Sequence, residues 1–259
     1  MDLDALGPLA HLPHLALLLA AAFVAGTLNA VAGGGSFLTL PALVFTGVPP
    51  VVANATGTVA LLPGYAAAAW GFREDAAPPP GLTMGRLIAL SLLGGAAGAA
   101  LLLVTPEATF RRIVPWLLLA ATALFAAGPR LRQWTGASHA PASPVRAALG
   151  VLAVAAYGGY FNGGLGILLL ALFGLLGQTQ LHAMNGLKNL VSALLTAIAV
   201  ALYAAGGLVL WPQALAMMAA ATAGGYGGAR LARRIPAHWL RAGIVATGLV
   251  MAAIFFMRG

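Results

Sequence analysis

The feature that most constrains this chain is a series of eight long apolar runs, which leaves little room for polar structure. They lie near residues 15–46, 51–72, 87–104, 113–128, 147–177, 187–210, 212–229 and 239–257. Each is long enough to enter or cross the hydrocarbon core of a bilayer. The chain is 7% charged, against about 25% in a typical soluble domain. Because the runs are continuous rather than alternating, they predict an all-α polytopic membrane protein.

A repeat divides the chain into two related halves. A glycine-rich break at Gly33–Pro41 interrupts the first run, and a similar break follows Asn162. At an offset of 133 residues, Asn29 aligns with Asn162 and Gly33 with Gly166; at 131, Asn54 aligns with Asn185. Later glycines keep an offset of 130, pairing Gly94, Gly95 and Gly98 with Gly224, Gly225 and Gly228.

The repeat predicts how the chain is organised. The first repeat should cover residues 12–128, a cytoplasmic linker 129–146, and the second repeat 147–257. Each half should hold five helical elements, which in the first half are 15–31, a short 36–46, 52–72, 87–104 and 113–127. The expected architecture is about eight transmembrane helices, plus short or broken hairpin helices at the glycine-rich motifs.

The arginines predict an orientation. If the segments 73–86, 129–146 and 230–241 are cytoplasmic, they hold nine arginines and leave three on the opposite face. The positive-inside rule favours this arrangement in the inner membrane, with both termini in the periplasm. It also makes the two repeats inverted, as in many secondary transporters. The net charge of +8 lies in short loops between spans, so it does not indicate nucleic-acid binding.

Lys188 is the single lysine of the chain and falls within an apolar run. On a helix it would share a face with Asn185 and Asn189. An ammonium within a bilayer is costly unless it is paired. The five acidic residues, expected in tails or loops, are Asp2, Asp4, Glu74, Asp75 and Glu107. A visiting anion is therefore a natural counterion, although Lys188 at the membrane interface, reaching water near His182, is the structural alternative.

Polar residues and glycines around the two breaks complete the predicted substrate site. The polar members besides the Lys188 face are Asn29, Asn54, Thr56, Thr58 and Asn162, each of which alone is more often a helix cap or an interhelical hydrogen bond. The break residues Gly33, Gly34, Gly35, Ser36, Gly164 and Gly166 free backbone N–H groups at helix starts, which suits an oxyanion.

Other chemistry finds little support in the sequence. His182 is a candidate proton relay, with a plain surface histidine as the alternative. The chain has no cysteine, and its histidines show no metal-ligand spacing. No acid–base pair or nucleophile triad is present at a useful spacing. We therefore expect neither an enzyme nor a bound cofactor or metal.

The paired motifs resemble those of the sulfite exporter TauE/SafE family of bacterial membrane permeases. They are GGGSFLTLPAL (33–43), ANATGT (53–58), GYFNGGLGILLL (159–170), MNGLKNL (184–190) and GGARLARRIP (227–236). The resemblance covers nearly the whole chain and implies a multi-span transporter for small sulfur-containing anions. It also implies that Asn54 and the Asn185–Asn189 segment lie around the substrate pathway. Gly57 stands where many relatives carry a polar residue. This favours a binding site centred on Lys188 over a symmetric, two-sided pocket.

Together with the residues above, the resemblance implies an exporter of sulfite, sulfoacetate or another organosulfonate, with its binding site at mid-membrane between the two repeats. The expected partners are the small anionic substrate and the lipid bilayer, and a homodimer is left open as an assembly state. The alternative function is a non-transporting membrane protein that assists the assembly or maturation of a partner protein.

Overall fold

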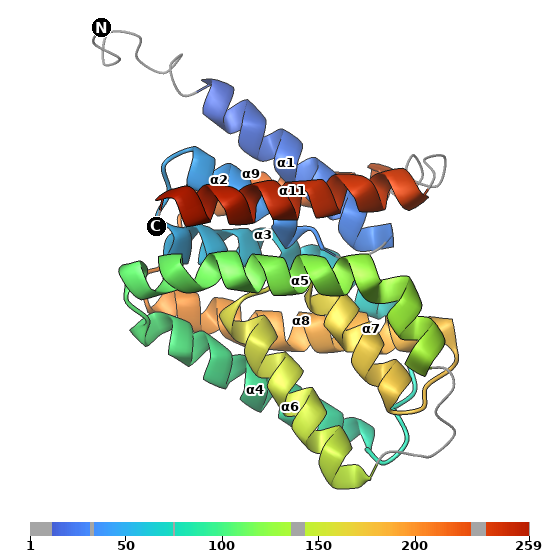
Figure 1. Cartoon of the computed structure of the whole chain (residues 1–259). Helices are drawn as coiled ribbons and strands as arrows, with labels where there is room; N and C mark the ends of the chain where they lie inside the picture. The colour runs from blue at the N-terminus through green and yellow to red at the C-terminus, as the bar shows by residue number, and fades with distance from the viewer. Residues whose placement is uncertain (1–11, 32–33, 75, 136–142, 229–236, 259) are drawn as a thin grey trace, which may run out of the picture.

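The computed structural model describes residues 12–31, 34–74, 76–135, 143–228 and 237–258, and all structural statements below concern these residues (Figure 1). They form ten α-helices and one π-helix, without a strand. The elements are α1 (Leu12–Val31), α2 (Ser36–Phe45), α3 (Pro50–Gly71), α4 (Met84–Val104), α5 (Glu107–Thr135), α6 (Pro144–Tyr160), α7 (Leu165–Leu175), α8 (Leu181–Ala205), α9 (Trp211–Ala223), the π-helix η2 (Gly224–Gly228) and α11 (Ala237–Arg258). The all-α prediction is confirmed.

Four helices are long and apolar enough to cross a membrane by length and composition. These candidate spans are Leu12–Asn29, Pro50–Gly71, Met84–Val104 and Ala183–Ala205. Shorter apolar helices include α2 and α7, which occupy the places where the sequence predicts short hairpin helices. The total of about eight spans stays a prediction.

The first four helices begin and end within three residues of their predicted bounds, whereas α5 is much longer than expected. It begins at Glu107 rather than 113, and it continues to Thr135, into the segment predicted as linker. Arg111 and Arg112 interrupt the apolar run but are exposed, so they leave the helix intact. An apolar run marks only the residues that are buried or face lipid, so the helix that contains it can extend beyond it at both ends.

The helix ends also correct the repeat register at the breaks. α6 ends at Tyr160, 129 residues after the end of α1, and α7 begins 129 residues after the start of α2. The predicted offset of 133 is therefore wrong here. Asn29 lies inside α1, whereas Asn162 lies in the break that follows α6, so these two asparagines do not occupy equivalent positions.

The two halves interlock rather than forming separate bodies. α4 of the first half packs on α6 of the second, and α1 packs reciprocally on α9 and η2. The pair α3–α9 has its counterpart in α8–α4. The pairs α3–α8 and α5–α11 each join a helix to its own counterpart. Exchanging the halves leaves this set of packing pairs unchanged, and the largest hydrophobic core draws residues from both halves.

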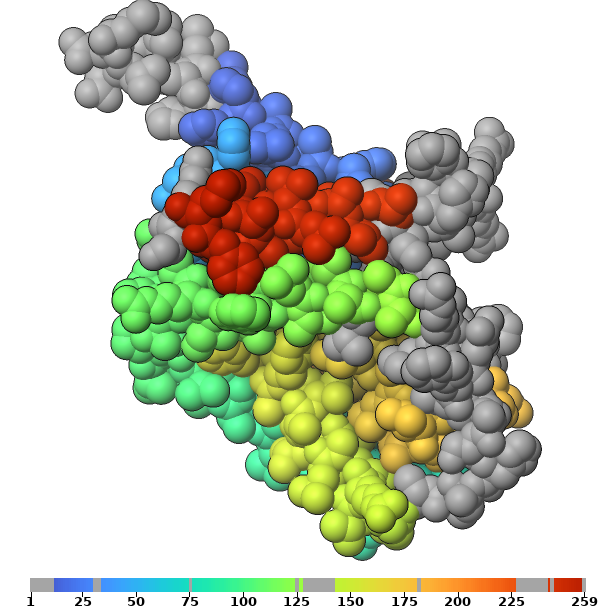
Figure 2. Space-filling model, viewed as in Figure 1, coloured from blue at the N-terminus to red at the C-terminus, as the bar shows by residue number. Residues whose placement is uncertain are grey.

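The helices α3 and α8 run antiparallel. A Cβ on Gly186, in the first turns of α8, would lie 3.0 Å from the Phe72 carbonyl oxygen at the end of α3. At the opposite end of α8, the Leu210 N–H donates to Thr56 Oγ1 near the start of α3, at 3.1 Å. Figure 1 shows the same opposed directions for α5 and α11, and Figure 2 shows α11 lying along α5.

Glycines allow the helices of opposite halves to cross at close range. A Cβ on Gly98 would overlap the carbonyl oxygen of Ala156, where α4 crosses α6. A Cβ on Gly26 would overlap the carbonyl oxygen of Ala221, where α1 crosses α9. The α4–α6 crossing corresponds to the α1–α9 crossing when the two halves are exchanged. Both crossings depend on a small residue at the point of contact.

Candidate functional site

The glycine-rich breaks of the two halves meet inside the protein. Ser36 Oγ, at the start of α2, donates to the Asn162 carbonyl oxygen in the second break, at 2.8 Å. The Tyr65 hydroxyl of α3 donates to Asn162 Oδ1 at 3.4 Å. Gly34 and Gly164 both adopt positive φ, +104° and +71°, just before α2 and α7 begin. Residues 126 positions apart in sequence are thereby joined at one point.

Side chains hold each break in place. Asn29 Oδ1 accepts from the Gly35 N–H at 2.8 Å, which ties the end of α1 to the start of α2. Asn54 Nδ2 of α3 donates to the Tyr160 carbonyl at 3.0 Å, across the halves. The Tyr157 hydroxyl donates to the Gly163 carbonyl at 2.7 Å. The side chains of Asn29 and Asn54 therefore satisfy backbone groups that the interrupted helices leave unpaired at the breaks.

The N-termini of two helices converge at this junction. α2 begins at Ser36 and α7 at Leu165, with Gly35 and Gly164 as their capping residues and Gly166 in the first turn of α7. A helix N-terminus carries roughly half a positive charge. Because Ser36 touches Asn162, three residues before α7, the positive ends of both helices lie close together. That arrangement favours a negative ligand.

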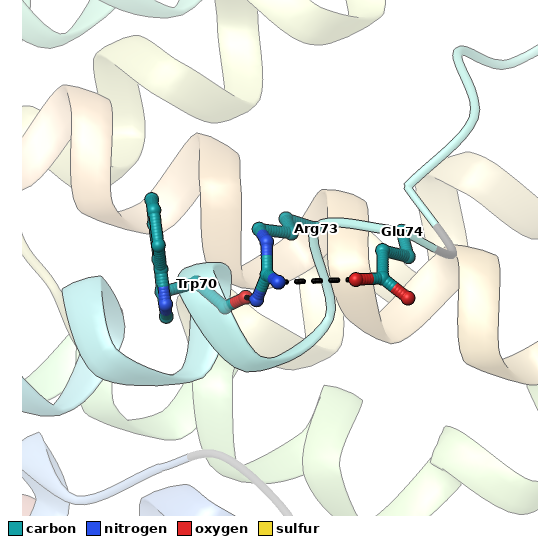
Figure 3. Close-up of polar contacts among 3 residues, drawn as sticks. All are labelled: Trp70, Arg73 and Glu74. Atoms are coloured by element: carbon teal, nitrogen blue, oxygen red, sulfur yellow. Dashed lines mark hydrogen bonds and ion pairs between the residues drawn. The ribbon is translucent and has the colours of Figure 1, made fainter.

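Lys188 lies on α8 and is buried, with 5% of its surface exposed. Within the described part of the chain, its ammonium forms no hydrogen bond or ion pair. Arg73, by contrast, is an exposed cation with a counterion. It pairs with Glu74 at 3.0 Å and stacks on Trp70 at 4.7 Å (Figure 3). The single lysine is therefore largely buried and has no protein counterion among the described residues.

Lys188 does not lie at the centre of α8. It follows Gly186, which packs against the end of α3, by two residues, and this spacing places it about 3 Å further along the helix axis. Lys188 therefore lies near the end of the bundle that also carries Arg73. The meeting point of the breaks lies deeper, because a Cβ on Gly158, near the end of α6, would lie 3.1 Å from Leu195 of α8.

A cavity of about 270 Å³ adjoins the first break. Its polar lining includes Asn29, Tyr65 and Asn189, contributed by α1, α3 and α8, and the remaining lining is mainly apolar. Lys188 does not line it, since it lies one residue before Asn189 and about 100° around the helix. The cavity connects the predicted asparagine face of α8 to the side chain that anchors the first break.

Several buried polar atoms near these elements have no hydrogen-bond partner among the described residues. Four of them are Asn29 Nδ2, Asn162 Nδ2, Ser192 Oγ and Thr196 Oγ1. The amide nitrogens are donors only, and the hydroxyls can also donate. A buried polar group without a partner costs about 1–3 kcal/mol, so each such group calls for an explanation. An acceptor oxygen is the partner that each of these four groups could use.

Ser192 and Thr196 are the residues that sequence reasoning missed. Ser and Thr within a helix usually bond the carbonyl four residues back. Thr58 does so to Asn54 and Ser91 to Leu87, as the isolated sequence leads one to expect. Ser192 and Thr196 follow Lys188 at intervals of four residues, which places all three on one side of a helix. This spacing could have identified them from the sequence.

Other predicted site residues lie elsewhere or serve the fold. Thr56 Oγ1 accepts from the N–H of Leu210, the residue just before α9. Asn185 is half-buried on α8. Gly33 and the side chain of His182 lie outside the described residues. At Gly57, a Cβ would lie 2.9 Å from Thr39 Oγ1, so a side chain at the position equivalent to Lys188 would force Thr39 to shift.

Glu107 is not the loop residue that the sequence predicted. It is the first residue of α5, half-buried, and its Oε2 accepts from Val51 N at 3.3 Å. Val51 lies in the first turn of α3, so the carboxylate serves the start of that helix. It stands at an end of the bundle and leaves Lys188 unpaired.

Comparison with known proteins agrees with the membrane architecture. The family model for the sulfite exporter TauE/SafE matches residues 18–255. A probable membrane transporter protein of Haemophilus influenzae is 31% identical over 250 residues, covering 92% of this chain and 93% of the relative. The probable membrane transporter protein YfcA of Escherichia coli is 27% identical over 240 residues, covering 92% of this chain and 88% of the relative. No solved structure matches.

Proposed function

The chain belongs to the sulfite exporter TauE/SafE family, and we propose that it exports a small sulfur-containing anion across the inner membrane. The substrate would be sulfite, sulfoacetate or another organosulfonate. The observation that carries this proposal is the excess of buried donors. Lys188 is buried without a counterion, and the two break asparagines leave amide N–H groups unpaired among the described residues.

The chemistry of the donors favours a sulfur oxyanion. Sulfite and sulfonates offer three acceptor oxygens and a full negative charge in a compact group. The unpaired Asn29 and Asn162 amides, together with the N-termini of α2 and α7, would direct donors toward those oxygens. A cation would meet the same donors unfavourably. The cavity of about 270 Å³ has room for such a small anion but adds few polar groups of its own.

Transport requires that the site open to each side in turn, and we propose that inverted halves provide this. The antiparallel packing of α3 with α8 and the exchange symmetry of the helix pairs support inversion. Broken helices at the interface of inverted repeats are where many secondary transporters bind their substrates. Both chain ends would then lie in the periplasm.

The membrane potential would drive export without a coupling ion. An inside-negative potential favours outward movement of one negative charge by about 2.3 kcal/mol per 100 mV. That energy supports a gradient of about fiftyfold for a monoanion. The transport cycle would then carry net charge, and it would not depend on His182.

A flux assay in proteoliposomes tests the proposal. Purified protein is reconstituted with sulfite, sulfoacetate, taurine or sulfate inside, and efflux is followed with an inside-negative potassium diffusion potential. We expect potential-dependent efflux of at least one sulfur-containing anion above that from protein-free vesicles. Absence of efflux for all four, together with a stoichiometric partner protein that co-purifies from the native membrane, would replace transport with the assembly-factor function.

A further inference from the structure

One face of α8 carries a line of polar groups that have no hydrogen-bond or ion-pair partner among the described residues. Lys188, Ser192 and Thr196 are spaced four residues apart and therefore follow one side of the helix. Their exposed fractions are 5%, 0% and 0%. Neither hydroxyl has a partner among the described residues, although other helical hydroxyls in this protein bond the carbonyl four residues back. The line spans about 12 Å along the helix axis.

The two ends of this line lie at different depths in the bundle. Its Lys188 end lies near the end of α3, as the packing of Gly186 against Phe72 places it. Its Thr196 end lies at the depth of the second break, because neighbouring Leu195 approaches Gly158 of α6. Seven residues beyond Thr196 on the same side, the Tyr203 hydroxyl donates to the Gly159 carbonyl at the end of α6. This face of α8 therefore turns toward the end of α6 and the break that follows it.

The residues that directly precede the two hydroxyls are apolar and lie about 100° further around the helix. Val191 and Leu195 are as deeply buried as Ser192 and Thr196, and they pack in the second hydrophobic cluster with residues of α4, α6 and α7. The two hydroxyls thus lie on a strip beside these apolar side chains, at equal depth and in the same turns. Membrane helices place unpaired polar groups toward a cavity or a partner rather than toward lipid.

We propose that Ser192 and Thr196 form a track of hydrogen-bond donors that carries the sulfonate or sulfite group between Lys188 and the junction of the two breaks. This inference rests on the proposed function, which it deepens by assigning substrate-contacting residues along the route. Lys188 attracts the anion at the end of the bundle. Each hydroxyl then replaces part of the water that the anion loses as it moves inward, which lowers the cost of its desolvation.

Cysteine labelling tests the track directly, because the chain contains no native cysteine. The single variants Ser192→Cys and Thr196→Cys are reconstituted beside the matched controls Val191→Cys and Leu195→Cys. The probe is sulfonatoethyl methanethiosulfonate, a thiol reagent that itself carries a sulfonate. We expect the thiols introduced in place of Ser192 and Thr196 to react at least tenfold faster than the two controls, and sulfoacetate to slow that reaction. Equal rates in all four variants would overturn the track.

Two further variants keep the test independent of cysteine chemistry. In Ser192→Ala and Thr196→Val the unpaired hydroxyls are lost, so thermal stability should stay equal or rise while KM for sulfoacetate efflux rises at least fivefold. A fall in stability with unchanged KM would show a structural role and overturn the inference. The parent chain is assayed in the same vesicles. If the parent moves no anion, the proposed function fails, while the labelling rates still decide whether the route is accessible.

Discussion

At the scale of single residues, one buried hydrogen bond between Ser36 and Asn162 joins the two halves at their breaks. This 2.8 Å hydrogen bond connects the first turn of α2 to the break after α6, and both residues are buried. This contact fixes the distance between the two breaks, and with it the positions of the amides around them. Local chemistry at the breaks therefore depends on long-range packing.

Replacing Ser36 with alanine should lower stability by about 1–3 kcal/mol, since the buried Asn162 carbonyl loses a donor. The measurement is thermal unfolding in detergent. Thr222→Ala is the matched control. Its hydroxyl is exposed and bonds the Met218 carbonyl of its own helix, so its removal should change stability by less than about 0.5 kcal/mol. Equal effects of the two changes would contradict the proposed junction.

The sequence predicted part of the candidate site for physical reasons that are specific to each residue. Lys188 could be identified because a lone cation in an apolar run is costly wherever it lies. The asparagines could be identified because glycines beside them interrupt helices. The unpaired state of Ser192 and Thr196 could not, since it depends on side-chain rotamers. The role of Thr56 required the start of α9, 154 residues away.

At the scale of elements, helix contacts between the halves depend on glycine. α4 meets α6 and α1 meets α9 at positions where a Cβ would overlap a neighbouring carbonyl oxygen. The length of α5 illustrates the limit of sequence reasoning. An apolar run gives the buried or lipid-facing part of a helix, while its ends depend on caps and on charged residues that tolerate helical geometry, such as Arg111 and Arg112.

Gly98→Ala should destabilise the protein by about 1–3 kcal/mol, because the added methyl group forces α4 and α6 apart. Gly64→Ala is the control within α3. A Cβ there meets nothing within 4 Å, so the change should be neutral or stabilise the helix by up to about 1 kcal/mol. Thermal unfolding of both variants checks the prediction. Destabilisation by Gly64→Ala equal to that by Gly98→Ala would show that the crossing is not tightly packed.

At the scale of the whole molecule, inversion of the halves predicts the sidedness of counterpart helix ends. Glu74 follows the end of α3, and Ala205 is the last residue of α8. In the cysteine-free chain, Glu74→Cys should react with a membrane-impermeant thiol reagent only after cells are permeabilised, whereas Ala205→Cys should react in intact cells. Reaction of both from the same side would exclude inverted halves.

In the proposed mechanism, the buried charge of Lys188, which has no counterion among the described residues, serves a transported anion. The most direct test compares potential-driven sulfoacetate or sulfite efflux from vesicles that contain wild type, Lys188→Met or Arg86→Met. Arg86 is an exposed cation at the start of α4 and serves as the control. We predict that Lys188→Met lowers efflux at least tenfold without loss of thermal stability, because an unpaired buried charge is removed, while Arg86→Met retains efflux. Wild-type efflux in Lys188→Met vesicles would contradict the account.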